Sequence, residues 1–208
     1  MVNLNKVELK KKGQAINLTK SSNNALGEIL VNLNWNQQSK GKSGGFLAGL
    51  LGKSKGIDLD LGCLYELKSG EKGCVQALGN AFGSYRNAPY MELDGDDRTG
   101  TAIGGENLRI NGNQIEDINR ILVYSFIYEG VANWSEADGI VTLQYPSGPA
   151  IEVKLDEHRN GKIMCAIAMI ENVNNETFKV ERLVEYFQGH QDMDRAYGWG
   201  MQWQAGRK

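Results

Sequence analysis

The amino-acid sequence predicts an all-β fold, a β-sandwich of two antiparallel sheets with long loops and little helix. At least seven segments carry the apolar and β-branched residues of strands, and turn signals such as "NG", "SG" and "EG" lie between them. The chain also has 26 glycines against 3 prolines in 208 residues, which indicates many tight turns. Seven or more strands with few helices favour a β-sandwich over an α/β fold.

The first two predicted strands show the period of two that is typical of a strand with one buried face. They are "ILVNLNWN" (29–36) and "IDLDLGCLYEL" (57–67), and their apolar faces consist of Ile29, Val31, Leu33, Trp35, Ile57, Leu59, Leu61, Cys63, Tyr65 and Leu67. Five further strands are predicted at "RILVYSFIYEG", "GIVTLQYP", "AIEVKLDE", "KIMCAIAMIENV" and "TFKVERLVEYF". Helix is expected only in short stretches such as "NQIEDINR" (113–120).

We expect a single sandwich domain over residues 1–208, because the length suits one domain and 41% hydrophobic residues can form a substantial core. A compositionally biased loop insertion, "QQSKGKSGGFLAGLLGKSKG", occupies residues 37–56. The C-terminal tail, "DMDRAYGWGMQWQAGRK", is rich in Trp and Gly. Its aromatic residues Trp199 and Trp203 are expected to pack the tail onto the sandwich.

The net charge of -2 is unevenly distributed along the chain. Residues 1–56 hold nine Lys or Arg and two acidic residues, whereas residues 57–208 hold fourteen Lys or Arg and twenty-three acidic residues. The lysines of the basic front part are interspersed with apolar strand residues, which favours a solvated face over a surface that binds a polyanion. No nucleic-acid partner is therefore expected.

Cysteine usage predicts a cytoplasmic protein. The chain has three cysteines, Cys63, Cys74 and Cys165, with no C-x-x-C pair. Their odd number, together with the lack of a recognisable secretory signal or Arg-rich transit segment, favours a reducing compartment. No apolar run approaches the roughly 20 residues that a membrane-spanning helix needs.

The insertion contains "GLLGKS", which is similar to a phosphate-binding loop but lacks the glycine required at position 47 and leads into a strand. Its large apolar residues lie between lysines, which suits docking to a protein partner or to an anionic membrane surface. The docking residues would be Phe46, Leu47, Leu50, Leu51 and Lys53. The alternative is a loop whose leucines fold back onto the domain.

Two acidic clusters are candidates for a cation site. Asp58 and Asp60 share one face of a predicted strand, where two close carboxylates need a compensating charge or solvent. The second cluster lies in "YMELDGDDRTGTAIGGENL" and consists of Asp94, Asp96, Asp97 and Glu106. Crowded carboxylate oxygens in loops are the ligands that Ca²⁺ prefers, although acidic turn residues also commonly cap backbone amides and face water.

The spacing within the second cluster excludes an EF-hand, because the required glycine and glutamate positions are Thr99 and Gly105. Any calcium site must therefore combine separate loops. Zinc is disfavoured because the chain has only two histidines, His158 and His190, and neither has a Cys or His at ligand spacing. Nucleophilic catalysis by cysteine would depend on the same two histidines.

The segments, in their order along nearly the whole chain, resemble the TerD-type tellurite-resistance and stress-protein family, in particular its TerA-like members. The matching segments are "GQAINLTK", "LNWN", "IDLDLGCLYEL", "GDDRTG", "GENLRIN", "RILVYSFIYEG" and "YGWGMQW". The resemblance implies a β-sandwich that binds Ca²⁺ through acidic loop residues at one end. It also implies a cytoplasmic bacterial protein that acts with other tellurite-resistance proteins, some of them membrane-associated, and has no established catalytic role.

Within this resemblance, Asp58 and Asp60 match the family's D-L-D motif, and Asp96 and Asp97 match its G-D-N-x-T-G turn, with Asp97 replacing the asparagine. Two departures remove carboxylates. "GGEN" around Glu106 stands where the family usually has G-D-D-E, and Asn36 stands where many members carry Asp.

The expected function is a calcium-binding, non-enzymatic stress-response module that docks to protein partners, with peripheral membrane association as one mode. One alternative is an enzyme that uses the same aspartates and a divalent metal to transfer phosphoryl or glycosyl groups. A third hypothesis is a purely structural sandwich whose acidic end is solvated.

Overall fold

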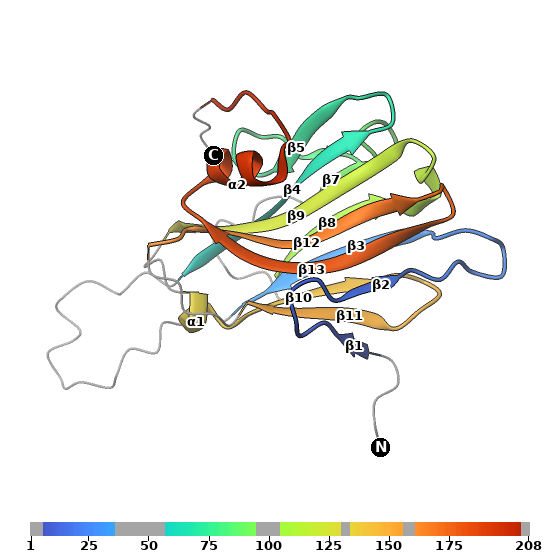
Figure 1. Cartoon of the computed structure of the whole chain (residues 1–208), viewed down its shortest axis with the longest axis horizontal. Helices are drawn as coiled ribbons and strands as arrows, with labels where there is room; N and C mark the ends of the chain where they lie inside the picture. The colour runs from blue at the N-terminus through green and yellow to red at the C-terminus, as the bar shows by residue number, and fades with distance from the viewer. Residues whose placement is uncertain (1–5, 36–56, 95–104, 130–133, 156–160, 205–208) are drawn as a thin grey trace, which may run out of the picture.

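The computed structural model describes residues 6–35, 57–94, 105–129, 134–155 and 161–204. Their strands form two sheets that pack face to face (Figure 1). The predicted all-β sandwich with little helix is therefore confirmed.

The first sheet has seven strands in the order β1-β11-β10-β3-β8-β7-β6. These strands are β1 (Lys6–Glu8), β3 (Glu28–Asn34), β6 (Gly83–Ser84), β7 (Met91–Leu93), β8 (Glu106–Asn111), β10 (Gly139–Gln144) and β11 (Ala150–Leu155). The strands β1 and β11 pair in parallel, which differs from the antiparallel pairing predicted throughout. Parallel pairing is possible there because a long stretch of chain connects the two strands.

The second sheet has six strands in the order β2-β13-β12-β9-β4-β5. Its members are β2 (Ala15–Asn17), β4 (Asp58–Leu67), β5 (Lys72–Gln76), β9 (Ile118–Glu129), β12 (Met164–Val173) and β13 (Thr177–Phe187). The long central strands of this sheet correspond to the most apolar segments of the sequence.

The core between the sheets contains the apolar faces that the alternation predicts. The buried residues of the two first predicted strands are Ile29, Val31, Leu33, Trp35, Ile57, Leu59, Leu61, Cys63 and Leu67, and Tyr65 packs against them. Trp35 and Ile57 flank residues 36–56, and the indole Nε1 of Trp35 donates a hydrogen bond of 2.9 Å to the carbonyl oxygen of Ile57. The insertion itself lies outside the described residues.

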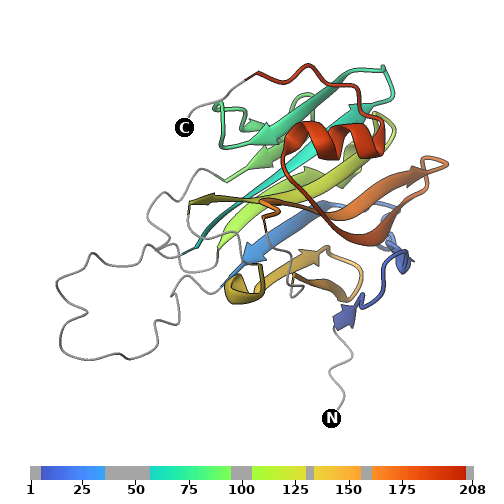
Figure 2. The ribbon, with the colours of Figure 1, turned by 60° about the vertical axis from the view of Figure 1, so that its left-hand side comes forward.

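A second apolar cluster covers the outer face of the six-stranded sheet, where helix α2 (His190–Tyr197) and the chain after it lie against the strands (Figure 2). The cluster joins sheet residues such as Leu64 and Tyr124 to Met193 and Trp199. Strands buried on both faces need apolar residues at nearly every position, which explains the continuous hydrophobic runs in β9 and β12.

Helices are few and short, but one prediction about them is wrong. The stretch 113–120, expected as helix, begins in the 3₁₀ turn η1 (Gly112–Gln114) and continues into β9 from Ile118. The eight-residue helix α2 begins two residues before the segment interpreted as a tail and continues into it. Gly198 ends the helix with a φ of 62°, a conformation that favours glycine. A further short helix, α1, covers Trp134–Ala137.

Among the described residues, no helix has the length and apolar character needed to cross a bilayer.

Candidate functional site

The candidate site lies where β4 begins, at one end of the six-stranded sheet. The pairing of β4 with β5 ends at Gly62 and Gln76, so Asp58 and Asp60 lie on the part of β4 that extends beyond its neighbour. On its other side β4 continues to pair with β9. The strand β5 therefore does not pair with the stretch of β4 that carries the two aspartates.

Glu106 joins the two sheets at this end. It is the first residue of β8 and points inward with Leu108 and Ile110, and only 5% of its surface is exposed. Its Oε2 accepts a hydrogen bond of 2.5 Å from the backbone N–H of Leu61 on the opposite sheet. Glu106 was predicted to be a loop residue, but it is a strand residue. Its carboxylate accepts the hydrogen bond of the Leu61 N–H, which lies on the part of β4 that does not pair with β5.

Asp60 is completely buried, with an exposed fraction of 0%. The alternation along β4 places it on the outer face with Gly62 and Leu64, and its register partner on β9 is Phe126. Burial raises the pKa of the nearby Tyr124 phenol well above its ordinary value, and the charge of Asp60 contributes to the same shift. A carboxylate in such surroundings carries a large desolvation cost.

Asp58 is half-buried, and its register partner on β9 is Glu129. Like charges directly opposite each other across two strands are destabilising unless a cation or hydrogen bonds compensate them. The register between β4 and β9 shifts between Asp58 and Leu59, so that Tyr128 is the extra residue on β9. Glu129 was not predicted as a site residue, because only the pairing of strands far apart in the sequence brings it beside Asp58.

Among the described residues, Asp94 is exposed and does not share the buried position of Glu106. Asp94 follows β7 directly, is exposed, and donates its backbone N–H to the carbonyl oxygen of Asn107 at 2.9 Å. Its charge helps to raise the pKa of Arg109, after the larger effect of the Glu28 hydrogen bond. Arg109 lies on the outer face of the seven-stranded sheet, whereas Glu106 points into the sandwich.

Asp96 and Asp97 lie outside the described residues, as do Asn36 and the proposed docking residues Phe46, Leu47, Leu50, Leu51 and Lys53. Within the described part of the chain, no group of three or more His, Cys, Asp and Glu side chains is arranged to hold a metal ion. The described residues therefore supply one pair of carboxylates, Asp58 opposite Glu129, and the separately buried Asp60 and Glu106, but not a full set of ligands.

The cysteines and the described histidine are placed as packing residues. Cys63 and Cys165 are buried, and burial raises the pKa of the Cys63 thiol far above its ordinary value. A thiol without thiolate character is a poor nucleophile. Burial lowers the pKa of His190 to about 4, and its ring lies between aromatic rings of the outer cluster. His158 lies outside the described residues.

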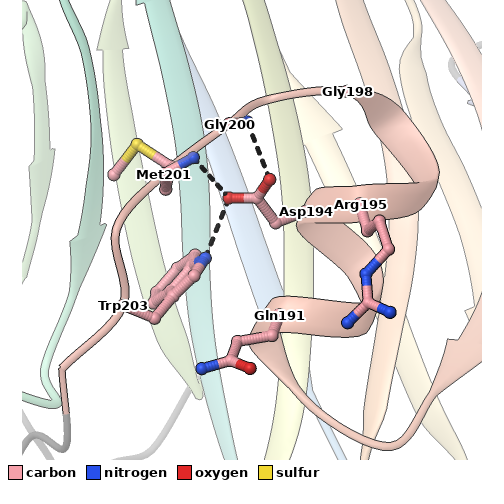
Figure 3. A pocket seen from close by; sticks show the side chains of 7 residues that line it. All are labelled: Gln191, Asp194, Arg195, Gly198, Gly200, Met201 and Trp203. Carbon is pink, nitrogen blue, oxygen red and sulfur yellow. Dashed lines mark hydrogen bonds between the residues drawn. The ribbon is translucent and has the colours of Figure 1, made fainter.

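A second polar centre holds the C-terminal segment onto the sheet (Figure 3). The carboxylate of Asp194, on α2, accepts hydrogen bonds of 2.8 Å from the backbone N–H groups of Gly200 and Met201 and from the indole Nε1 of Trp203. Nearby, Trp199 is buried, and the guanidinium of Arg120 lies 4.0 Å from the centre of its ring. Both carboxylate oxygens of Asp194 accept hydrogen bonds from groups of the chain itself, so these contacts serve packing.

The chain is similar in sequence to a known protein and similar in fold to solved structures. No protein-family model matches the chain. Over 207 residues, the whole chain is 50% identical to tellurium resistance protein TerA from Alcaligenes sp., and the match covers 60% of that protein. The chain thus spans less than two thirds of the length of this curated relative.

Two solved structures share the fold at low sequence identity. A protein of unknown function, SAV2460, aligns with a TM-score of 0.60 and 12% identity over 86% of this chain and 99% of its own. A homologue of the telluride resistance protein TerD, SCO6318 from Streptomyces coelicolor A3(2), aligns with a TM-score of 0.54 and 14% identity over 81% of this chain and 95% of its own.

Proposed function

This chain belongs to the TerD-type tellurite-resistance family as a TerA-like member, and from that premise we propose that it is a calcium-binding, non-enzymatic stress-response module. The observation that carries the proposal is the burial of two carboxylates, Asp60 and Glu106, at one end of the sandwich. Ionised carboxylates removed from water need compensating charge or hydrogen bonds. The described acidic residues at this end offer carboxylate oxygens, which suit a hard cation such as Ca²⁺.

The acidic residues at the end of the sandwich where β4 begins have different roles in the proposal. Asp58 and Asp60 would bind the ion, and Asp96 and Asp97, which lie outside the described residues, would supply further oxygens. Glu106 holds the amide of Leu61 and so fixes the strand that presents Asp60. The bound ion would supply the positive charge that neutralises the acidic end, which would let neighbouring loops meet a partner without like-charge repulsion.

Isothermal titration of chelator-treated protein with Ca²⁺ tests this proposal. We expect saturable binding by the wild type, and the isosteric substitution Asp60→Asn should weaken it at least about tenfold, because a charged oxygen ligand is lost. Asp192→Asn is the matched control, since Asp192 is an exposed residue of α2 on a different element. Binding that is unchanged in Asp60→Asn, or weakened equally in both variants, would contradict the assignment of Asp60.

A non-enzymatic role is proposed over metal-dependent phosphoryl or glycosyl transfer. Such chemistry commonly uses an activated nucleophile or a general base. In the described part of the chain, Cys63 and Cys165 are buried and His190 packs among aromatic rings. Turnover of a phosphate ester or nucleotide sugar that requires both a divalent metal and Asp60 would favour the enzyme.

We place the protein in the cytoplasm and propose other tellurite-resistance proteins as its partners. The proposed docking segment is the Lys-flanked apolar part of residues 37–56, with Phe46, Leu47, Leu50, Leu51 and Lys53 as its contacts. Apolar residues bracketed by cations suit a protein surface or an anionic membrane. Co-sedimentation with lipid vesicles tests the membrane mode.

A further inference from the structure

A basic groove of about 820 Å³ opens beside β13. In the six-stranded sheet, β13 is the neighbour of the edge strand β2 (Figure 1). Its walls come from the turn between β1 and β2, from Lys162 two residues before the start of β12, from β13 and from α2. The charged side chains that line it are Lys10, Lys11, Lys12, Lys162, Arg182 and Glu185. Five cations against one carboxylate make this groove strongly positive.

Arg182 is the central observation. It lies on β13 and lines the groove, yet only 6% of its surface is exposed. Within the described residues its Nε has no hydrogen-bond partner, and no ion pair of its guanidinium is present. A buried guanidinium group without a partner is energetically costly, because it has lost hydration without gaining a counter-charge. An anion in the groove would supply the missing partner.

The lysines are held beside Arg182 by backbone hydrogen bonds. The N–H of Gly13 donates to the carbonyl oxygen of Arg182, and the N–H of Arg182 donates to the carbonyl oxygen of Gln14, each at 2.9 Å. The side-chain Oε1 of Gln14 in turn accepts from the backbone N–H of Lys10 at 2.9 Å. The turn that carries Lys10, Lys11 and Lys12 is thus fixed to β13, so its charges are positioned before any ligand arrives.

Strand β13 is bulged next to Arg182. Ala168 pairs with Arg182 and Ala166 with Glu185, so that two residues of β13, Leu183 and Val184, lie between these pairs. Val184 has a φ of 49°, a conformation that a β-branched residue rarely adopts. Bulges re-aim neighbouring side chains and often lie beside functional sites.

The carboxylate in the groove is already compensated. Glu185 pairs with Lys12 and accepts a hydrogen bond of 2.5 Å from the hydroxyl of Tyr197. Lys10 pairs at 3.4 Å with Glu8, which also pairs with Lys154. Lys11, Lys162 and Arg182 therefore remain as the positive charges available to a ligand.

From this arrangement we propose that the groove binds a small oxyanion, with the Arg182 guanidinium as its principal contact and Lys11 and Lys162 as supporting charges. The planar fork of arginine can donate two parallel hydrogen bonds to such an anion, which a lysine ammonium cannot. The site is distinct from the proposed calcium site, because β9 and β12 lie between β4 and β13.

Calorimetric titration of the full chain at low ionic strength, with chelator present, tests the proposal. The probes are inorganic phosphate and tellurite, both small oxyanions. We expect saturable binding of at least one probe and a loss of affinity of at least about tenfold in Arg182→Gln. The affinity of Arg182→Lys should fall between those of the wild type and Arg182→Gln, since lysine keeps the positive charge but not the planar fork of donors.

Lys179→Gln is the matched control, because Lys179 lies on the same strand but pairs with Glu171 and Glu181 outside the groove. Equal weakening by Lys179→Gln and Arg182→Gln would reduce the effect to net charge and overturn the proposal. Failure of the wild type to bind either probe would also overturn it. Because chelator removes Ca²⁺, the outcome does not depend on the calcium proposal.

A second set of variants covers the case in which Arg182→Gln does not fold. Lys11 is exposed and Lys162 is half-buried, so Lys11→Gln combined with Lys162→Gln should leave the fold intact. We expect this double variant to lose about tenfold in oxyanion affinity, since it removes two of the available charges. Unchanged affinity in a folded double variant would contradict the proposed site.

Discussion

At the scale of single residues, His190 shows how burial decides a protonation state. Its ring centre lies 5.2 Å from that of Phe126 and 4.7 Å from that of Trp203, and its Nε2 lies 2.9 Å from Oε1 of Gln76. The same Gln76 oxygen accepts from the hydroxyl of Tyr124 at 2.7 Å. Burial lowers the pKa of His190 to about 4, so the imidazole is neutral and donates to Gln76 at physiological pH.

This depressed pKa predicts a dependence of stability on pH. An unfolded chain protonates His190 near pH 6.5, whereas the folded chain resists protonation down to about pH 4. The unfolded state therefore binds more protons in this window, and the free energy of unfolding falls as the pH decreases from 6.5 to 4, by roughly 3 kcal/mol in total. Urea unfolding at a series of pH values measures this slope.

The variant His190→Gln should reduce the slope between pH 6.5 and 5, because it removes the titrating group. Gln191→Ala, a change at an exposed and non-titrating neighbour, should keep the wild-type slope. Carboxylates with lowered pKa values, such as those of Glu66 and Glu185, affect stability mainly at more acidic pH. Identical slopes in wild type and His190→Gln would contradict the prediction.

At the scale of elements, helix α2 depends on tertiary contacts more than on its own sequence. Eight residues are too few for an isolated helix to be stable in water. Met193 is buried against the sheet, and Asp194 ties the helix to the chain that follows it, as Figure 3 shows. The helix and the tryptophan segment therefore form one packed unit that covers the outer face of the six-stranded sheet.

Removing the Asp194 carboxylate should loosen this unit. Asp194→Ala leaves two backbone N–H groups and the Trp203 indole without their acceptor, and we expect a loss of about 3 kcal/mol in the free energy of unfolding. Tryptophan fluorescence during urea unfolding and limited proteolysis of the C-terminal segment measure the effect.

Asp192→Ala is the control for this prediction, because Asp192 lies on the same helix with 46% of its side chain exposed and only a 3.6 Å contact to Arg195. Its cost should stay below about 0.5 kcal/mol. Equal losses in the two variants would show that the hydrogen bonds of Asp194 are not what holds the segment.

At the scale of the whole molecule, most of the positive charge of residues 1–56 belongs to two separate parts of the sequence. Lys10, Lys11 and Lys12 line the groove beside β13, whereas Lys40, Lys42, Lys53 and Lys55 flank the apolar residues of the insertion. The indole of Trp35 donates a hydrogen bond to the backbone carbonyl of Ile57, so the described residues on either side of 36–56 lie together.

This division predicts the behaviour of the chain with lipid vesicles. If the insertion docks to membranes, the wild type should co-sediment with anionic but not neutral vesicles, since each lysine near the surface contributes about 1 kcal/mol. The double variant Phe46→Ser and Leu50→Ser should lose this binding, whereas Lys11→Gln in the groove should retain it. A marked loss of thermal stability in the double variant would instead identify Phe46 and Leu50 as core residues.

The sequence alone determined which faces of the main strands are buried. The alternation in residues 29–35 and 57–67 is a local property, because side chains in a strand change face at every residue. The same reasoning identified Asp58 and Asp60 as an unusual pair, and the order of segments identified the family. These inferences need no knowledge of which strands are neighbours.

Only the tertiary structure decided which distant residues meet. The pairing of Asp58 with Glu129, the bond from Leu61 to Glu106 and the approach of Gln14 to Arg182 all depend on strand register. Register joins residues far apart in the chain and is set by the packing of both sheets together, so no local pattern reports it. The helix α2 escaped prediction for the same physical reason, since its stability comes from the sheet on which it packs.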